Sequence, residues 1–198
     1  MAELADLLAG GRIRRITRWS EPILHGPSTP VAKFGSDLHT LLRDMFATMA
    51  AADGVGLAAS QVDDDRSVFI YRCPDADDQV HIGVMINPTV ILPEGNDRRL
   101  VSDDEGCLSL PGAYAPLARP DQAICQGFDH NGDPIEIIGT GLLARCLQHE
   151  ADHLTGMVFG DRLSARSRRR LNADHEALAY RYPADWPISP KGEFDPTK

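Results

Sequence analysis

The chain has 198 residues, 42% of them hydrophobic, and a formal net charge of −9. This predicts a soluble globular protein with a sizeable core, because no run approaches the ~20 apolar residues of a membrane span. The acidic balance argues against general nucleic-acid binding, so neither DNA nor a membrane is expected as a partner. The first fifteen residues include Glu3 and Asp6 and lack the apolar stretch of a secretory signal, which favours a cytoplasmic location.

The first clear helical periodicity spans residues 36–52. Apolar residues recur there every three to four positions, as in a helix with one face in the core. We expect Ser36 to cap the start of this helix and Gly54 to end it.

A β-rich region follows the first helix. Residues 67–72, 80–87 and 122–128 are enriched in Val, Ile, Phe and Tyr, which favours strands. Asn131-Gly132 is typical of a hairpin turn and leads into residues 134–138. The pattern predicts antiparallel pairing.

The last part of the chain is predicted to be helical. A second helix fits residues 139–154, with Gly156 as its stop, and a third fits residues 164–180. Residues 183–198 are rich in proline and lack periodicity, so we expect an extended or disordered tail there. Residues 1–182 are then expected to form a single domain.

The second helix contains the residues that point most directly to chemistry. His149 and His153 are four positions apart and so share a helix face, with Glu150 beside them. Two such imidazoles can bind a divalent ion, and the thiolate of Cys107 is the obvious third ligand, leaving one position open for water. The set predicts a hydrolytic metal site, although paired histidines on a buried helix can also be core residues.

A small-residue stretch lies directly after the first helix. Gly54 and Gly56 allow the backbone to approach a ligand closely, and Gln61 offers an amide donor for a developing oxyanion. The same composition also fits close packing of a loop on a helix, and the residues alone leave both interpretations open.

Three motifs occur in order along the chain: Gly54-Val55-Gly56-Leu57-Ala58-Ala59-Ser60-Gln61, Glu105-Gly106-Cys107-Leu108-Ser109 and His149-Glu150-Ala151-Asp152-His153. They resemble the GxGxAAxQ, EGCLS and HExDH motifs of the peptide deformylases, and the resemblance runs from about Arg12 to Ser164. It implies an α+β fold, with antiparallel β-sheets packed around a central HExxH helix and with N-terminal and C-terminal helices. The implied reaction removes the formyl group from the N-terminal formylmethionine of newly synthesised polypeptides and releases formate.

The resemblance also implies a role for individual residues. The metal ligands are Cys107, His149 and His153, Glu150 is the general base and acid, and Gln61 with the backbone N–H of Leu108 stabilises the oxyanion. Val55, Gly56 and Gly106 resemble walls of the family pocket that takes a methionine side chain. Leu142 and Cys146 precede His149 by seven and three residues on the same helix face, so we expect them to line the region beside the metal. Arg145, four residues before His149, is expected at the rim, either near substrate backbone or packed on the surface. Glu105 and Arg119 resemble an ion pair that braces the cysteine loop, and Asp152 is expected to support the site rather than to react.

The identity of the metal follows from the resemblance rather than from the ligands. Residue types alone suggest zinc in a Cys-His-His site with an open position. The family instead implies iron(II), with zinc, nickel or cobalt as substitutes, because these donors bind several divalent ions.

Two other functions remain open from the residues. A zinc endopeptidase would use Glu176 as its third ligand and leave Cys107 without a role. A deformylase-like protein without activity could instead bind a partner through an arginine-rich segment.

That arginine-rich segment, residues 161–181, holds six arginines against three acidic residues. Its local charge of +3 leaves −12 on the rest of the chain. The segment is either a solvated helix face or a surface that contacts ribosomal RNA near the exit of the nascent chain.

Overall fold

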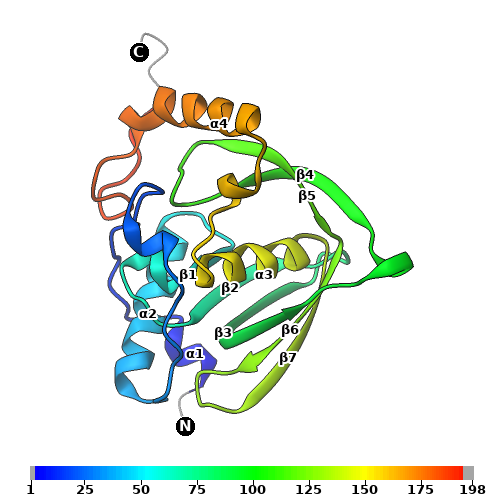
Figure 1. The fold of residues 1–198 in the computed structure, drawn as a ribbon. Coiled ribbons are helices and arrows are strands. Elements are labelled where there is room, and N and C mark those ends of the chain that lie inside the picture. The colour runs from blue at the N-terminus through cyan, green and yellow to red at the C-terminus, as the bar shows by residue number, and fades with distance from the viewer. Residues whose placement is uncertain (1–2, 194–198) are drawn as a thin grey trace.

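The computed structural model describes residues 3–193, and its strands form two antiparallel sheets (Figure 1). The larger sheet has the order β1-β2-β3-β6-β7, and the smaller one pairs β4 with β5. The strands are β1 (Gly56–Ala58), β2 (Val68–Pro74), β3 (Val80–Ile91), β4 (Leu100–Gly106), β5 (Tyr114–Pro120), β6 (Gln122–Phe128) and β7 (Pro134–Thr140).

The α-helices are α1 (Leu4–Leu7), α2 (Ser36–Ala51), α3 (Gly141–Leu154) and α4 (Ala165–Leu178). Short 3-10 turns are η1 (Pro22–His25), η2 (Ala59–Val62), η3 (Gly95–Asp97), η4 (Phe159–Arg162) and η5 (Ala179–Arg181). Helix α3 contacts all five strands of the large sheet and also β5, whereas α4 lies beyond β4 and β5 at the far end of the molecule (Figure 1). Within residues 3–193, no helix is both long and apolar enough to cross a membrane.

The α+β class and the antiparallel pairing are confirmed, and the four predicted strand regions correspond to β2, β3, β6 and β7. The connection between β6 and β7 is a five-residue loop, in which Gly132 takes φ +90° and donates its N–H to Asp129. Strands β1, β4 and β5 were not predicted. Strand β4 is mostly exposed and includes Ser102, Asp103 and Asp104, so it lacks the apolar alternation that marks a strand.

The two ends of α2 differ from the predicted ones, whereas the end of α3 agrees with its prediction. Gly35, not Ser36, occupies the cap position of α2, and no side chain caps it. At the other end, Asp53 takes the left-handed conformation (φ 55°), while Gly54 donates its N–H to the Met49 carbonyl. Gly156 ends α3 as predicted, with φ +80° and its N–H bonded to the His153 carbonyl.

Three clusters of buried apolar side chains connect the layers. The first packs α2 against the N-terminal segment, β2 and β3, and the second packs α3 against β2 and β3. The third joins the loop after β4 to η4 and α4, and it includes Cys107, Leu110, Phe159 and Leu171. Each of the three motifs therefore lies beside a packed core.

Residues 183–193 belong to the segment expected to be an extended or disordered tail, but residues 184–189 form turns and bends. Trp186, only 4% exposed, belongs to the first core cluster. The Trp186 carbonyl accepts a hydrogen bond from the N–H of Ile16, and its ring packs edge-on against Tyr182. Burial of this large aromatic side chain favours an ordered segment, although the proline content of the sequence there suggests an extended one. Residues 194–198 of the predicted tail lie outside the described residues.

Candidate metal centre and active site

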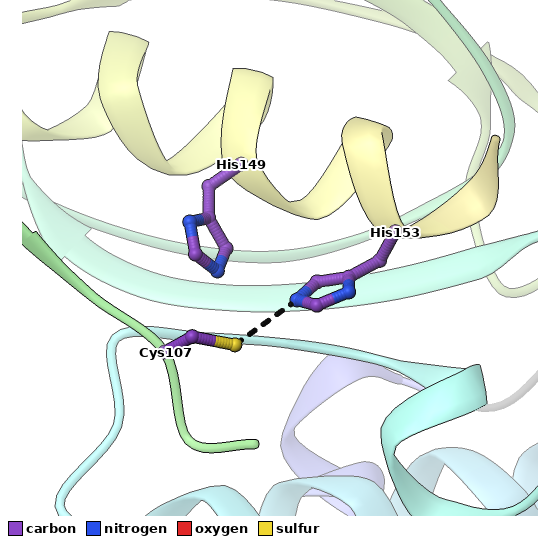
Figure 2. A group of neighbouring side chains, drawn as sticks. All are labelled: Cys107, His149 and His153. Carbon is purple, nitrogen blue, oxygen red and sulfur yellow. Dashed lines mark hydrogen bonds between the residues drawn. The ribbon is translucent and has the colours of Figure 1, made fainter. Parts of the chain in front are cut away.

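The structure brings Cys107, His149 and His153 together, as Figure 2 shows. One ligand atom from each lies within 4.8 Å of the other two, and all three residues are buried. The Sγ atom of Cys107 lies 3.3 Å from Nε2 of His153. Burial lowers the pKa of His153 well below its usual value, so the imidazole is neutral, as a metal ligand must be.

A buried carboxylate orients the ring of His149. Nδ1 of His149 lies 2.7 Å from Oε1 of Glu105. Because an ionised carboxylate only accepts hydrogen bonds, we assign a ring proton to Nδ1. Burial alone would lower the pKa of His149, but its contacts with Cys107 and Glu105 outweigh this and raise it well above its usual value, so a metal would bind at Nε2 in place of a proton. The donor set of one thiol and two imidazoles suits a divalent transition metal.

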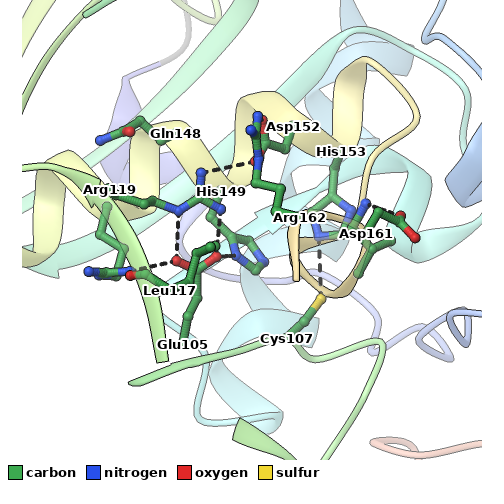
Figure 3. A network of polar contacts seen from close by, with 12 residues as sticks. Glu105, Cys107, Leu117, Arg119, Gln148, His149, Asp152, His153, Asp161 and Arg162 are labelled. Atoms are coloured by element: carbon green, nitrogen blue, oxygen red, sulfur yellow. Dashed lines mark hydrogen bonds and ion pairs between the residues drawn. The ribbon is translucent and has the colours of Figure 1, made fainter. Parts of the chain in front are cut away.

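Glu105 is the centre of a wider ion-pair network (Figure 3). Arg119 donates two hydrogen bonds to it, at 2.7 and 2.6 Å, and a third of 3.0 Å to Asp152. Asp152 in turn accepts from Arg162. Burial alone would raise the pKa of Glu105, but the hydrogen bonds from Arg119 and His149 outweigh it and hold that pKa well below its usual value.

Arg145 is placed differently from the sequence-based expectation. We expected its guanidinium at the pocket rim, near substrate backbone or packed on the surface. Although Arg145 lines the cavity, it is buried, and its Nη1 donates to Glu105 and to the Leu117 carbonyl, both at 2.9 Å. A further bond joins Nη2 to the Val101 carbonyl. The guanidinium therefore joins α3 to β4 and β5.

Gln61 lies beside the cysteine ligand. Its Oε1 accepts the backbone N–H of Ala58 at 2.9 Å, which fixes the amide plane. Its Nε2 then lies 3.5 Å from Sγ of Cys107 and 3.3 Å from Oγ of Ser109. Sulfur is a weak acceptor and the contact with Ser109 is long, so the amide hydrogens are available to a stronger acceptor at the site. Ser109 belongs to the EGCLS motif, but the sequence analysis gave it no role.

Glu150 is buried with one oxygen unpaired. Burial raises its pKa to about 7. Its Oε2 and Nδ1 of His153 are buried and lack a hydrogen-bond partner among the described residues. Glu150 lines the cavity, so its unpaired oxygen is available to a water or a substrate there. Gly56 packs directly on this carboxylate, because a Cβ there would overlap Oε1 of Glu150 and lie 2.7 Å from Sγ of Cys146.

The ligands open into a cavity of about 850 Å³. Every residue predicted for the substrate pocket lines it: Val55, Gly56, Gly106, Leu142, Arg145 and Cys146. Gln61, Leu108 and Glu150 also line it, as do Cys107 and His149. The sequence did not predict that Tyr114 and several C-terminal residues, including Trp186 and Ile188, also line this cavity.

Glu176 lies elsewhere, in a second cavity that it shares with Arg18 and His175. Among the described residues, the cluster with metal-ligand geometry contains Cys107 and not Glu176. The ligand set of a glutamate-dependent zinc endopeptidase is therefore not favoured.

Comparison with known proteins identifies the family. The model of the polypeptide deformylase family matches residues 13–169. The chain belongs to this family. It is 48% identical to peptide deformylase 1 of Streptomyces avermitilis, over 87% of this chain and 80% of that protein. Peptide deformylase 2 of Streptomyces coelicolor is 47% identical, over 82% of this chain and 89% of that protein.

Solved structures agree with this family assignment. A peptide deformylase from Legionella pneumophila superposes with a TM-score of 0.74 at 38% identity, covering 86% of this chain and 99% of its own. The enzyme from Ehrlichia chaffeensis, solved in complex with actinonin, gives a TM-score of 0.75 at 33% identity, covering 84% of this chain and 96% of its own.

The Glu105 network predicts a defined effect on metal binding. In Glu105→Gln, an uncharged amide faces Arg119, Arg145 and His149, and the orientation of the His149 ring is weakened. Metal affinity, measured by competition with a chelator, is expected to fall about 10- to 100-fold. Glu136→Gln, an exposed site on β7, is the matched control. Unchanged affinity in a folded Glu105→Gln protein would contradict the orienting role.

Proposed function

We propose that this chain hydrolyses the formyl amide of N-terminal formylmethionine on newly synthesised polypeptides and releases formate. The observation that carries the proposal is the convergence of Cys107, His149 and His153 within 4.8 Å at a cavity that Glu150 and Gln61 also line. A nascent-chain substrate places the activity in the cytoplasm, where translation occurs.

Cys107, His149 and His153 hold the metal in this proposal. A divalent ion bound there supplies Lewis-acid chemistry, lowering the pKa of water and polarising the formyl carbonyl. Glu150 accepts the proton of the attacking water and returns it to the departing amine, a double role that suits a carboxylate whose pKa burial has raised. Nε2 of Gln61 and the backbone N–H of Leu108 donate to the developing oxyanion.

The methionine side chain fits the apolar part of the cavity. Val55 and Leu142 expose their side chains there, and Cys146 adds a buried thiol wall. Gly56 and Gly106 let other groups pack directly on the backbone at the site, because a Cβ would overlap the carboxylate of Glu150 at Gly56 and the ring of Tyr114 at Gly106. Arg145 supports this pocket through its bonds to β4 and β5.

The catalytic role of Glu150 can be separated from metal binding. Glu150→Gln is nearly isosteric and is not a ligand, so the variant is expected to keep its metal. Formate release from a formyl-Met peptide is expected to fall by about 10²- to 10⁴-fold, since proton transfer is lost. Metal content and turnover are measured on the same samples.

Glu176→Gln is the control for the two alternatives. It is expected to retain both metal and turnover, whereas a zinc endopeptidase would lose both. Wild-type turnover in metal-loaded Glu150→Gln would contradict the proposed base. A metal-loaded wild-type protein that releases no formate would favour the silent binding protein.

We propose iron(II) as the native metal, as the family resemblance implies. Iron(II) and a thiolate ligand are both oxidisable, so activity is expected to decay in air and to persist after replacement by nickel or cobalt. Elemental analysis and turnover after anaerobic and aerobic purification check this. Full activity after prolonged aerobic handling, with zinc as the metal found, would contradict the iron assignment.

We further propose that α4 contacts ribosomal RNA. Arg166, Arg168, Arg169 and Arg170 are exposed on this helix, and Arg170 forms a 3.7 Å ion pair with Asp174. Arg162, before the helix, is paired with Asp152. The acidic remainder of the chain repels RNA at long range, so the contact must be local and sensitive to salt.

Replacement of Arg168, Arg169 and Arg170 by Ser is expected to reduce co-sedimentation with ribosomes at low salt. Turnover on a short formylated peptide should not change, because α4 does not line the metal cavity. The control variant replaces the exposed Arg12, Arg98 and Arg99 by Ser, which removes the same charge elsewhere. Equal co-sedimentation of both variants and wild type across a salt series would identify α4 as a solvated face.

A further inference from the structure

The cavity at the metal centre is larger than the first residue of a substrate requires. Its volume of about 850 Å³ lies in the upper part of the range for ligand pockets, roughly 300–1,000 Å³. The residues assigned to formylmethionine occupy only the wall formed by β1, α3 and the end of β4. The rest of the lining includes Tyr114 and several of residues 182–191.

Several apolar side chains that line the cavity are exposed. Tyr114 is 64% exposed and Ile188 is 54% exposed, and both line it together with Val55 and Leu142. Exposed apolar side chains that gather at one cavity indicate a binding surface, whereas isolated ones do not. The ring of Tyr114 lies over Gly106, next to the ligand Cys107, so this side chain lies close to the metal centre.

The C-terminal wall is held firmly in place. Gly192 donates its N–H to the Arg181 carbonyl at 2.7 Å, and Nε of Arg181 donates back to the Gly192 carbonyl at 3.2 Å. These two bonds close residues 181–192 into a loop. Inside it, Trp186 is buried, and the N–H of Ile188 bonds to the Asp185 carbonyl at 2.9 Å. Ile188 therefore projects from an ordered support.

The same loop contacts the segment that follows the cysteine ligand. Gly112 has φ +84°, and a Cβ there would lie 3.0 Å from the ring of Tyr182 and 3.1 Å from Leu178. The close approach holds the segment that leads into β5, where Tyr114 lies, against the loop that contains Ile188. Both side chains line the same cavity.

We propose that Ile188, with Tyr114, forms the subsite for the second to fourth residues of the formylated chain and sets a preference for apolar side chains there. The inference rests on the proposed function. The family model ends at residue 169, so Ile188 lies outside the region matched to the family. Asp53 and Asp104 line the cavity along with Lys191, so charges of both signs are present. Apolar contact rather than charge therefore decides the preference.

The test measures kcat/KM on formyl-Met-Ala-Ala-Ala and on three variants of this peptide with Leu at the second, third or fourth position. Wild type is expected to prefer Leu over Ala at one or more of these positions. In Ile188→Ser this preference should fall about five- to tenfold, since the Leu side chain loses an apolar partner. Turnover of formyl-Met amide, which ends before the subsite, should be unchanged.

Ile138→Ser on the edge strand β7 is the matched control, because Ile138 is 64% exposed and does not line the cavity. It should retain the wild-type preference. Ile188 is exposed, so its replacement is not expected to unfold the protein, and thermal unfolding of both variants checks this. Equal preference in wild type and Ile188→Ser, or no preference in wild type, would overturn the proposal. Failure of the proposed function is distinct, because wild type would then release no formate from any peptide.

Discussion

The buried carboxylate of Glu105 is the interaction on which the rest of the site depends. It accepts hydrogen bonds from Arg119, Arg145 and His149, so one side chain joins β4, β5 and α3. Burial of these charges is unfavourable unless each is paired, and removal of one partner from such a group typically costs about 3–5 kcal/mol. The network therefore fixes the separation of the cysteine and histidine motifs, because neither can move without leaving a charge unpaired.

Close packing imposes a second constraint on the same site. Gly56 leaves no room for a side chain between β1 and the carboxylate of Glu150, and Gly106 leaves none beneath Tyr114. Both glycines have ordinary backbone angles, so the requirement is for space rather than for a left-handed conformation. The small-residue stretch that could have been mere loop packing therefore does pack closely, and its contact is the group proposed as the catalytic base.

The sequence predicts the ligands better than it predicts their surroundings. Helical spacing places His149 and His153 on one face, and motif order relates them to Cys107, so the cluster follows from local patterns. The partners of Arg145 do not, because they are the backbone carbonyls of Val101 and Leu117, and Val101 lies on β4, an exposed strand without apolar alternation. The order of residues 183–193 was not predicted, for a different reason. Their prolines suggest an extended chain, and the burial of Trp186 depends on distant contacts with the first core cluster.

The C-terminal part also supports the metal centre mechanically. Leu171 of α4 shares a buried cluster with Cys107 and Leu110, and Leu178 and Tyr182 pack on Gly112. The short segment from Cys107 to Tyr114 is therefore held from one side by Glu105 and its arginines and from the other by α4 and η5. A ligand on a loop gains the rigidity that metal geometry requires when both flanks are fixed. The residues after the family match thus restrain the motif that defines the family.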